Sequence, residues 1–197
     1  MVNNTRLMKG ITKMIRKFFG HLKTVLTHKF WVFYYAVKLG IPIRGFFHDF
    51  SKFHPIEFFE SVKYYTGTRS PIDECKRVNG YSKAWMHHKS HNKHHYEYWQ
   101  DNFDNGGIPL CMPYKETLEM LCDYLGAGKA YNGRSFTFQK EYEWWKIKSS
   151  KPLAMHEVQK NFLEFAFWKM AQSNELISEM QLWFMYEVYK NDYEKEQ

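Results

Sequence analysis

The sequence has few cysteines and no long apolar run. Its three cysteines, Cys75, Cys111 and Cys122, form no CxxC pair. An odd number of cysteines without such spacing favours free, buried thiols in a reducing compartment over a disulfide framework. The longest apolar run, residues 30–37, is far shorter than the ~20 residues that span a bilayer. We therefore predict a soluble, cytoplasmic protein with no membrane span.

The sequence also lacks internal repeats, low-complexity tracts, Pro/Ser-rich linkers and sustained β-type alternation. A chain of 197 residues suits one domain with a substantial core, so residues 1–197 are predicted to form a single domain. Apolar residues recur at spacings of three and four, as at Leu22, Val25 and Leu26, up to a stop at Gly40. We predict an all-α helical bundle.

Further helices are expected where this spacing and helix-capping residues coincide. Proline at a first helical position marks two of them, and glycines are expected to end the helix that follows Pro113 at the sequence GAG. The expected segments are residues 55–67, 71–80, 81–100, 114–128, 137–148, 153–171 and 174–190.

The formal net charge is +7 with histidines neutral. This charge favours anionic partners such as nucleotides, nucleic acid or acidic lipid through long-range attraction. The first 23 residues are basic and amphipathic but lack the apolar segment and cleavage site of a secretory signal. For these residues we favour a first helix with a solvated Lys/Arg face over a membrane-surface segment.

Nine of the ten histidines fall between residues 21 and 95. His21 and His28 are seven residues apart and share one face of the first long helix. In the stretch HHKSHNKHH, His88, Asn92 and His95 step by four and three. A second row with the same spacing consists of His87, His91 and His94. A continuous helix would present two parallel rows of imidazole.

Imidazole is a good ligand for Zn, Mn, Fe and Ni, and carboxylate complements it. Asp49 directly follows His48 in the sequence HDFSK, and its two oxygens could bridge two ions. Asp123 lies in the apolar stretch EMLCDYLGAG, where an unpaired carboxylate would be costly to bury. The alternative for Asp123 is an exposed helical acid that is paired with a nearby lysine or capped locally. No Ser/His/Asp arrangement and no cysteine with an evident base partner competes with this metal chemistry.

The order H…HD…H…H…D resembles the HD-domain superfamily of metal-dependent phosphohydrolases. HKFWV at His28 resembles that superfamily's first-ligand helix, and HDFSK resembles its HD motif, with Ser51 where many members carry glycine. Asp123 would be the closing aspartate. The resemblance implies an all-α, HD-domain-like helical bundle in which side chains from several helices hold one or two divalent ions.

Residues 20–165 more closely resemble an uncharacterised bacterial and phage family of HD-like proteins. In that family we expect proline where this sequence has Lys93, which predicts a break within the His-rich segment. Residues 166–197 would form a C-terminal helical extension, either a capping helix or a homodimer surface. The family has no settled activity to transfer.

The resemblance implies two sets of metal ligands. One ion, of Mn, Fe, Zn, Ni or Mg, would be held by His28, His48, Asp49 and Asp123. A second ion would be held by His88 and His95, with Asp49 bridging, and His94 competes with His95 for this role.

Other residues are candidates for contacting substrate or for orienting the metal ligands. Lys52, one helical turn after His48, is placed to neutralise substrate phosphate or is a solvated lysine. Further candidates for substrate contact are His94, Asn92, Arg134 and His156. Asn92 could instead hydrogen-bond a ligand histidine. Residues that would orient the ligands are His21, His54, Glu119, His87 and His91. For each of these histidines an ordinary surface or core position is the alternative, and for Glu119 the alternative is an exposed acid.

We therefore predict a divalent-metal-dependent phosphohydrolase that acts on a small phosphorylated molecule, a nucleotide above all, through a metal-activated hydroxide. One alternative is an HD-type nuclease on single-stranded nucleic acid, whose binding would depend strongly on salt. Another is a non-catalytic nucleotide- or metal-binding module of phage origin.

Overall fold

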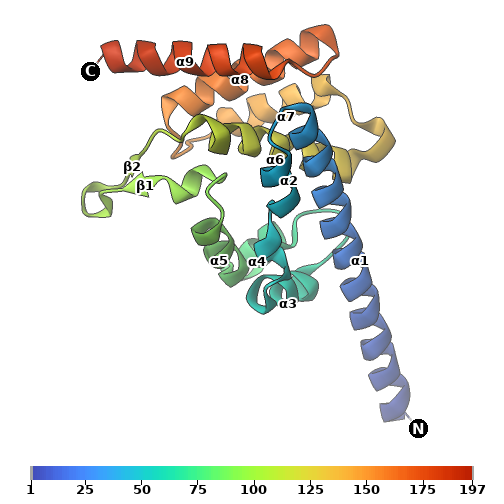
Figure 1. The fold of residues 1–197 in the computed structure, drawn as a ribbon. Helices are drawn as coiled ribbons and strands as arrows, with labels where there is room; N and C mark the ends of the chain where they lie inside the picture. Colours follow the sequence, from blue (N-terminus) through green and yellow to red (C-terminus); the bar gives the residue numbers. More distant parts are fainter. Residues whose placement is uncertain (1, 197) are drawn as a thin grey trace. The chain divides into compact units, whose positions relative to one another are not determined.

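The computed structural model describes residues 2–196, which are predominantly helical, so the predicted all-α fold is confirmed (Figure 1). The strands in this described part are the two-residue β1 (Gln100–Asp101) and β2 (Ile108–Pro109), which pair antiparallel. Contacts divide the chain into two compact units, and α1 (Val2–Lys38) contributes residues to both. The first unit contains residues up to Phe30 and Asp49–Asn92; the second contains Trp31–His48 and residues from Lys93 onward.

The first unit is built around α3 (Pro55–Tyr64), which follows the short 3-10 helix η1 (Phe50–Phe53). Helix α3 packs against α4 (Pro71–Asn79) and α5 (Lys83–His91). Pro55 and Pro71 occupy first helical positions, as predicted, because proline has no N–H to leave unpaired there. The buried apolar side chains of this unit include Val25, Phe58, Val62, Cys75 and Ala84.

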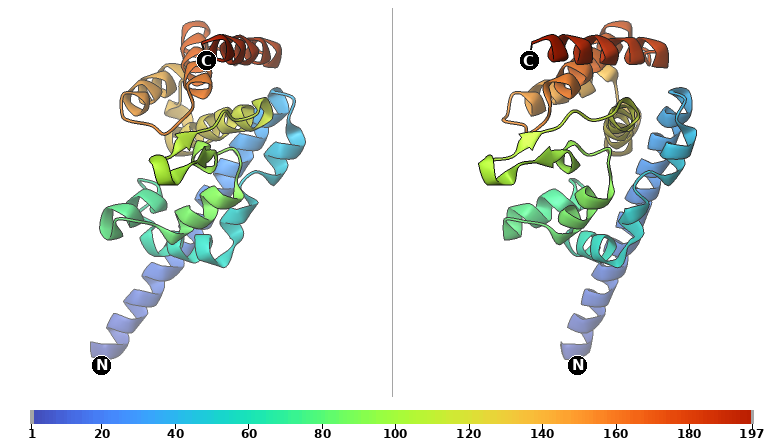
Figure 2. Two further views of the ribbon diagram at one scale, coloured as in Figure 1. Left: turned by 90° about the vertical axis from the view of Figure 1, so that its left-hand side faces the viewer. Right: turned by 60° about the vertical axis from the view of Figure 1, so that its left-hand side comes forward.

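The second unit holds the larger core. Its helices after the end of α1 are α2 (Pro42–Phe47), α6 (Tyr114–Asn132), α7 (Phe138–Ser149), α8 (Glu157–Ser173) and α9 (Glu179–Lys195). Short 3-10 turns are η2 (Tyr96–Tyr98), η3 (Phe103–Asn105) and η4 (Gly133–Ser135). Helix α8 packs against both α7 and α9 (Figure 2). Fully buried side chains at its centre include Leu121, Leu125, Trp145, Phe162 and Phe167.

The expected helix end at GAG is wrong, because α6 continues through these residues to Asn132. Gly126 lies where the backbones of α6 and α1 approach closely. A Cβ at Gly126 would lie 2.9 Å from the backbone N of Val32 and would overlap its Cγ2. A Cβ at Gly128 would likewise meet the Glu141 carboxylate. These glycines therefore serve packing and do not end the helix.

The expected helix over residues 81–100 is wrong beyond His91. Asn92 has φ −122° and ψ 102°, and its side-chain amide donates to the His88 carbonyl oxygen at 2.7 Å. This hydrogen bond satisfies one of the carbonyls that a helix end leaves unpaired. His94 and His95 consequently lie outside α5, and the two parallel rows of imidazole do not form. The family expectation of a break at Lys93 agrees with this ending.

The C-terminal helices begin where side chains cap them. The expected helix over residues 137–148 is confirmed, with the Thr137 side chain as its cap. Helix α8 begins at Glu157 rather than residue 153, because His156 accepts from the Val158 N–H. Helix α9 begins after Ser178 rather than at residue 174, where the backbone is left-handed. None of the helices within residues 2–196 has the length and apolar content that crossing a bilayer requires. The single-domain prediction stays a prediction.

Candidate metal centre

The HD dipeptide lies at a sharp turn after α2. His48 is extended, with φ −49° and ψ 132°, whereas Asp49 is left-handed, with φ 54° and ψ 29°. Such a conformation is uncommon for a residue other than glycine and is tolerated best by aspartate and asparagine. Both side chains are buried, each residue being 1% exposed. His48 belongs to the second unit and Asp49 to the first.

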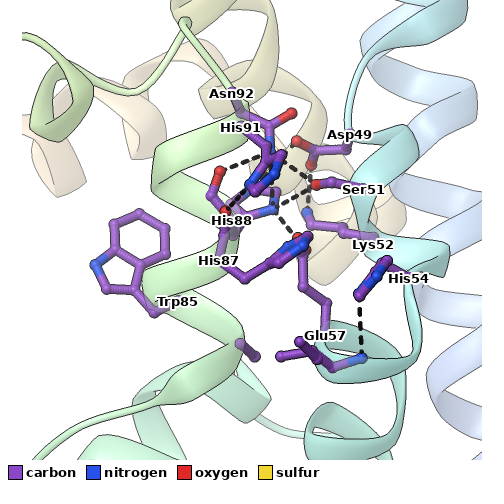
Figure 3. Close-up of polar contacts among 12 residues, drawn as sticks. Asp49, Ser51, Lys52, His54, Glu57, Trp85, His87, His88, His91 and Asn92 are labelled. Atoms are coloured by element: carbon purple, nitrogen blue, oxygen red, sulfur yellow. Dashed lines mark hydrogen bonds and ion pairs between the residues drawn. The ribbon is translucent and has the colours of Figure 1, made fainter.

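In the first unit, the two oxygens of Asp49 face different histidines. Asp49 Oδ1 lies 3.2 Å from His88 Nε2, and Oδ2 lies 3.4 Å from His28 Nε2. The Nζ atom of Lys52 lies 2.5 Å from Oδ2. Figure 3 shows Asp49 between η1 and the end of α5, with Lys52 and His88 directed toward it. Three predicted ligands, His28, Asp49 and His88, are thus brought together within this unit.

Glu57 of α3 fixes the ring of His88. His88 Nδ1–H donates to Glu57 Oε2 at 2.7 Å, and His87 Nδ1–H donates to Oε1 at 2.6 Å (Figure 3). Burial alone would raise the pKa of Glu57, but these hydrogen bonds and the charge of His88 lower it below its ordinary value. An ionised Glu57 keeps the proton on Nδ1 of His88. It therefore directs Nε2 toward Asp49, as carboxylates do for histidines that bind metals.

The second unit repeats this arrangement around His48. Its Nδ1–H donates to Glu119 Oε1 at 3.0 Å, and its Nε2 lies 3.4 Å from Asp123 Oδ1. Glu119 Oε1 also lies 3.2 Å from His94 Nδ1, and Arg44 donates to Oε2 at 3.2 Å. Burial opposes ionisation of Glu119, but hydrogen bonds from His48 and His94 lower its pKa to about 2. Glu119 is therefore a charged, buried acid.

Both arrangements suit a cation. Where Nδ1 carries the proton, Nε2 of His88 or His48 presents a lone pair to an aspartate oxygen, and a proton or a metal ion must separate these two electron-pair donors. In the second unit, His48, His94 and Glu119 offer ligand atoms that all lie within 4.8 Å of one another. Imidazole with carboxylate is the donor set of Zn, Mn, Fe and Ni sites. These buried residues could therefore hold a metal ion.

His94 and His95 differ in their surroundings. His94 is 2% exposed and is tied to Glu119, whereas His95 is half-buried, its ring centroid 4.3 Å from that of His94. Asn92, a predicted substrate residue, donates its amide to Ser51 Oγ at 2.7 Å. That hydroxyl lies 3.2 Å from His88 Nδ1, and the amide nitrogen of Asn92 also lies 3.2 Å from this ring nitrogen, so Asn92 borders the His88 ligand directly (Figure 3).

Three further histidines form a stack beside Glu57. The rings of His54 and His87 lie 4.3 Å apart, and those of His87 and His91 lie 4.1 Å apart, both nearly parallel (Figure 3). His54 also caps α3 by accepting from the Ile56 N–H at 3.4 Å. Through His87, this stack adjoins the carboxylate that orients His88.

Other predicted residues lie apart from these contacts. The ring of His21 packs 5.1 Å from that of Phe58, and burial, then the charge of Lys52, lowers its pKa to about 4. His156 caps α8, and Arg134 is exposed in η4. Within residues 2–196, no hydrogen bond or ion pair joins His21, His156 or Arg134 to a predicted ligand.

A family model described as "Family of unknown function (DUF5662)" matches residues 17–169. The chain belongs to the DUF5662 family. All the predicted metal ligands, from His28 to Asp123, lie within the matched part of this DUF5662 chain. Neither a search of curated proteins nor a search of solved structures found a match. The resemblance to the HD superfamily stays a prediction, because the matched family is not described by any activity.

Sequence reasoning missed two residues of this DUF5662 site, Glu57 and Arg44. Glu57 follows Pro55 in the first turn of α3, where an acid is expected simply because it complements the helix dipole. Arg44 lies in the short helix α2 and joins Glu116 and Glu119, at 2.8 and 3.2 Å. Their contacts join residues far apart in the sequence, so no local spacing pointed to them.

Proposed function

We propose that this chain is a divalent-metal-dependent phosphohydrolase that acts on a small phosphorylated molecule of the nucleotide class. One observation carries the proposal. Two buried histidines, His88 and His48, are each held through Nδ1 by a buried glutamate and directed through Nε2 at an aspartate oxygen. A carboxylate that accepts from the far ring nitrogen is the usual partner of a histidine that ligates a metal, which supports the proposal.

The proposal unites the two sets of ligands through the HD dipeptide. Asp49 of this dipeptide belongs to both sets of proposed ligands, and His48 belongs to the first. We assign one ion to His28, His48, Asp49 and Asp123. We assign a second ion to His88 with His94 or His95, and to Asp49 as the bridging carboxylate. The two oxygens of Asp49, which face two different histidines, support this bridging role.

When bound, divalent ions lower the pKa of water and offset the charge of phosphoryl oxygens. The chain's own residues would supply the positioning. Glu57 and Glu119 fix the rings and protonation of His88 and His48. Lys52, whose side chain is one quarter exposed and whose ammonium contacts Asp49, would offset charge on a substrate phosphate. The net charge of +7 would attract an anionic substrate.

The first test is metal content per chain, measured by plasma mass spectrometry on gently purified protein. The proposal predicts about two ions in the wild type, about one in His88→Ala and about none in Asp49→Ala. His156→Asn is the matched control, because asparagine also caps helices while the imidazole is removed. Wild-type protein without metal, even after soaking with Mn, Fe, Zn or Ni, would exclude the proposed site.

The second test is release of inorganic phosphate from nucleoside mono-, di- and triphosphates and from simple phosphoesters, each with Mn, Fe, Zn, Ni or Mg. Turnover that is lost in Asp49→Ala would support the proposal. A protein that holds stoichiometric metal yet turns over none of these esters would contradict it. Recovery of an intact, tightly bound nucleotide from that protein would instead favour the binding-module alternative.

The nuclease alternative is separated by the same preparations. It predicts cleavage of single-stranded nucleic acid and a binding affinity that falls steeply between two salt concentrations in a gel shift. The small-molecule proposal predicts phosphate release without such binding.

A further inference from the structure

The first turns of α1 carry basic residues and no acidic ones. Residues 7–23 include five cationic side chains and no aspartate or glutamate: Lys9, Lys13, Arg16, Lys17 and Lys23. The same segment exposes large apolar side chains, whose exposed fractions range from 45% at Ile11 to 68% at Met14. The exposed apolar set is Leu7, Met8, Ile11, Met14, Ile15 and Phe19.

The two kinds of side chain lie on opposite faces of the helix. At 3.6 residues per turn, positions 7, 8, 11, 14, 15, 18 and 19 share one face, and positions 9, 13, 16 and 23 share the other. The segment is therefore an amphipathic helix. Its apolar face is wide and continuous, and every charged side chain of its polar face is cationic.

This apolar face is covered only where the helix reaches α3. Lys17 Nζ donates to the Lys63 carbonyl oxygen at 2.6 Å, and the Phe18 ring lies 5.2 Å from that of Phe58. Farther along, Val25 is buried on the same face. Figures 1 and 2 show that the N-terminal turns of α1 extend beyond α3. An exposed apolar stripe of this length, bordered by polar side chains, is typical of an interaction surface.

The charge of the helix distinguishes two possible partners for this surface, a second copy of the helix and an anionic lipid surface. A second copy of the helix would bring cationic flanks together without one acid to pair with them, and like charges at such positions are destabilising. An anionic lipid surface complements both faces, because its acyl boundary accepts the apolar stripe and its headgroups attract the lysines.

We propose that residues 7–23 of α1 bind an anionic membrane surface as an in-plane amphipathic helix. The proposal is independent of the phosphohydrolase function. It replaces the solvated first helix favoured from the sequence, because composition alone did not show which apolar side chains are left exposed.

The test is co-sedimentation of the full chain with vesicles of phosphatidylcholine, with and without phosphatidylserine. We expect binding to the serine-containing vesicles, weakening as salt is raised, because salt screens the lysine–headgroup attraction. The double variant Ile11→Asp/Met14→Asp should lose about tenfold or more in vesicle affinity. Ile147→Asp, which changes an isoleucine of α7 that is 64% exposed, is the control and should bind as the wild type does.

Circular dichroism of each variant checks that α1 is still helical, and sedimentation velocity measures self-association. Wild-type protein that binds neither vesicle, or a double variant that binds as well as the wild type, would overturn the proposal. So would a wild-type dimer that ignores vesicles and dissociates in the double variant, because the stripe would then cover a second copy.

Discussion

His88 and His48 each have a carboxylate at both ring nitrogens. The sequence motif pointed to the histidines and to the aspartates at their Nε2 atoms, because their order and residue types are those of a known ligand set. It did not point to Glu57, which a first-turn position already explained, and it left Glu119 as an accessory or exposed acid. Partners at Nδ1 depend on tertiary contacts that no local pattern encodes.

Glu57→Gln tests whether this partner matters. A neutral amide cannot be the charged acceptor that holds Nδ1–H of His88, so we expect metal affinity to fall by about 10- to 100-fold. The measurement is a titration with Mn or Zn in a metal buffer. Glu60→Gln is the control on the same helix, because Glu60 accepts from Ser82 and the Ala84 N–H instead. Equal affinities for the two variants would show that Glu57 does not support a ligand.

Glu141 is a buried acid of α7 whose pKa is raised to about 7 by burial. Because its folded pKa exceeds its unfolded value, the native state binds more protons between the two values, and stability falls as pH rises through this window. Glu141→Gln removes that cost. We expect the urea midpoint of Glu141→Gln to rise relative to that of the wild type as the pH is raised from about 5 to about 8.

Glu143→Gln, an exposed acid on the same helix, is the comparison for Glu141 and should show no such gain. A difference between Glu141→Gln and the wild type that stays constant with pH would mean that Glu141 titrates normally.

At the scale of elements, capping residues were the reliable signals. Pro55, Pro71 and Thr137 mark helix starts in both the sequence and the structure. Gly126 was a misleading signal. A glycine that lets a neighbouring backbone pack closely against a helix cannot be told from a helix-ending glycine by sequence alone. The end of α5 was foreseen only through the family's proline, since Lys93 itself does not break a helix.

Gly126→Ala tests this packing explanation. Alanine is the better helix former by about 1 kcal/mol, but its Cβ would overlap Val32 of α1, so we expect a net loss of ~1–3 kcal/mol in the free energy of unfolding. Gly10→Ala is the matched control, because a Cβ there meets nothing within 4 Å. It should be neutral or stabilising by up to about 1 kcal/mol. The free energy of unfolding of both variants is measured in urea. A Gly126→Ala variant as stable as the wild type would contradict the close approach of α6 to α1 at Val32.

At the scale of the whole molecule, the chain passes from one compact unit to the other three times. These crossings follow Phe30, His48 and Asn92. Two of these crossings lie directly at predicted site residues, one within the HD dipeptide and one after Asn92. The spacing of apolar residues predicted the helical class and the composition gave the charge, but neither indicated this division, because neither unit is a continuous segment. An ion held by side chains of the folded chain is expected to stabilise the fold as well as to supply chemistry.

Metal removal should lower the thermal unfolding midpoint. A ligand that binds only the native state at about 100 times its dissociation constant adds about 2.7 kcal/mol to the free energy of unfolding. We expect added Mn or Zn to raise the midpoint of the wild type over that measured in chelator, with no such rise in Asp49→Ala. His156→Asn should respond as the wild type does, since it retains a helix cap and every proposed ligand. Equal wild-type midpoints with metal and with chelator would mean that the buried histidines and carboxylates stabilise the fold by their own hydrogen bonds alone.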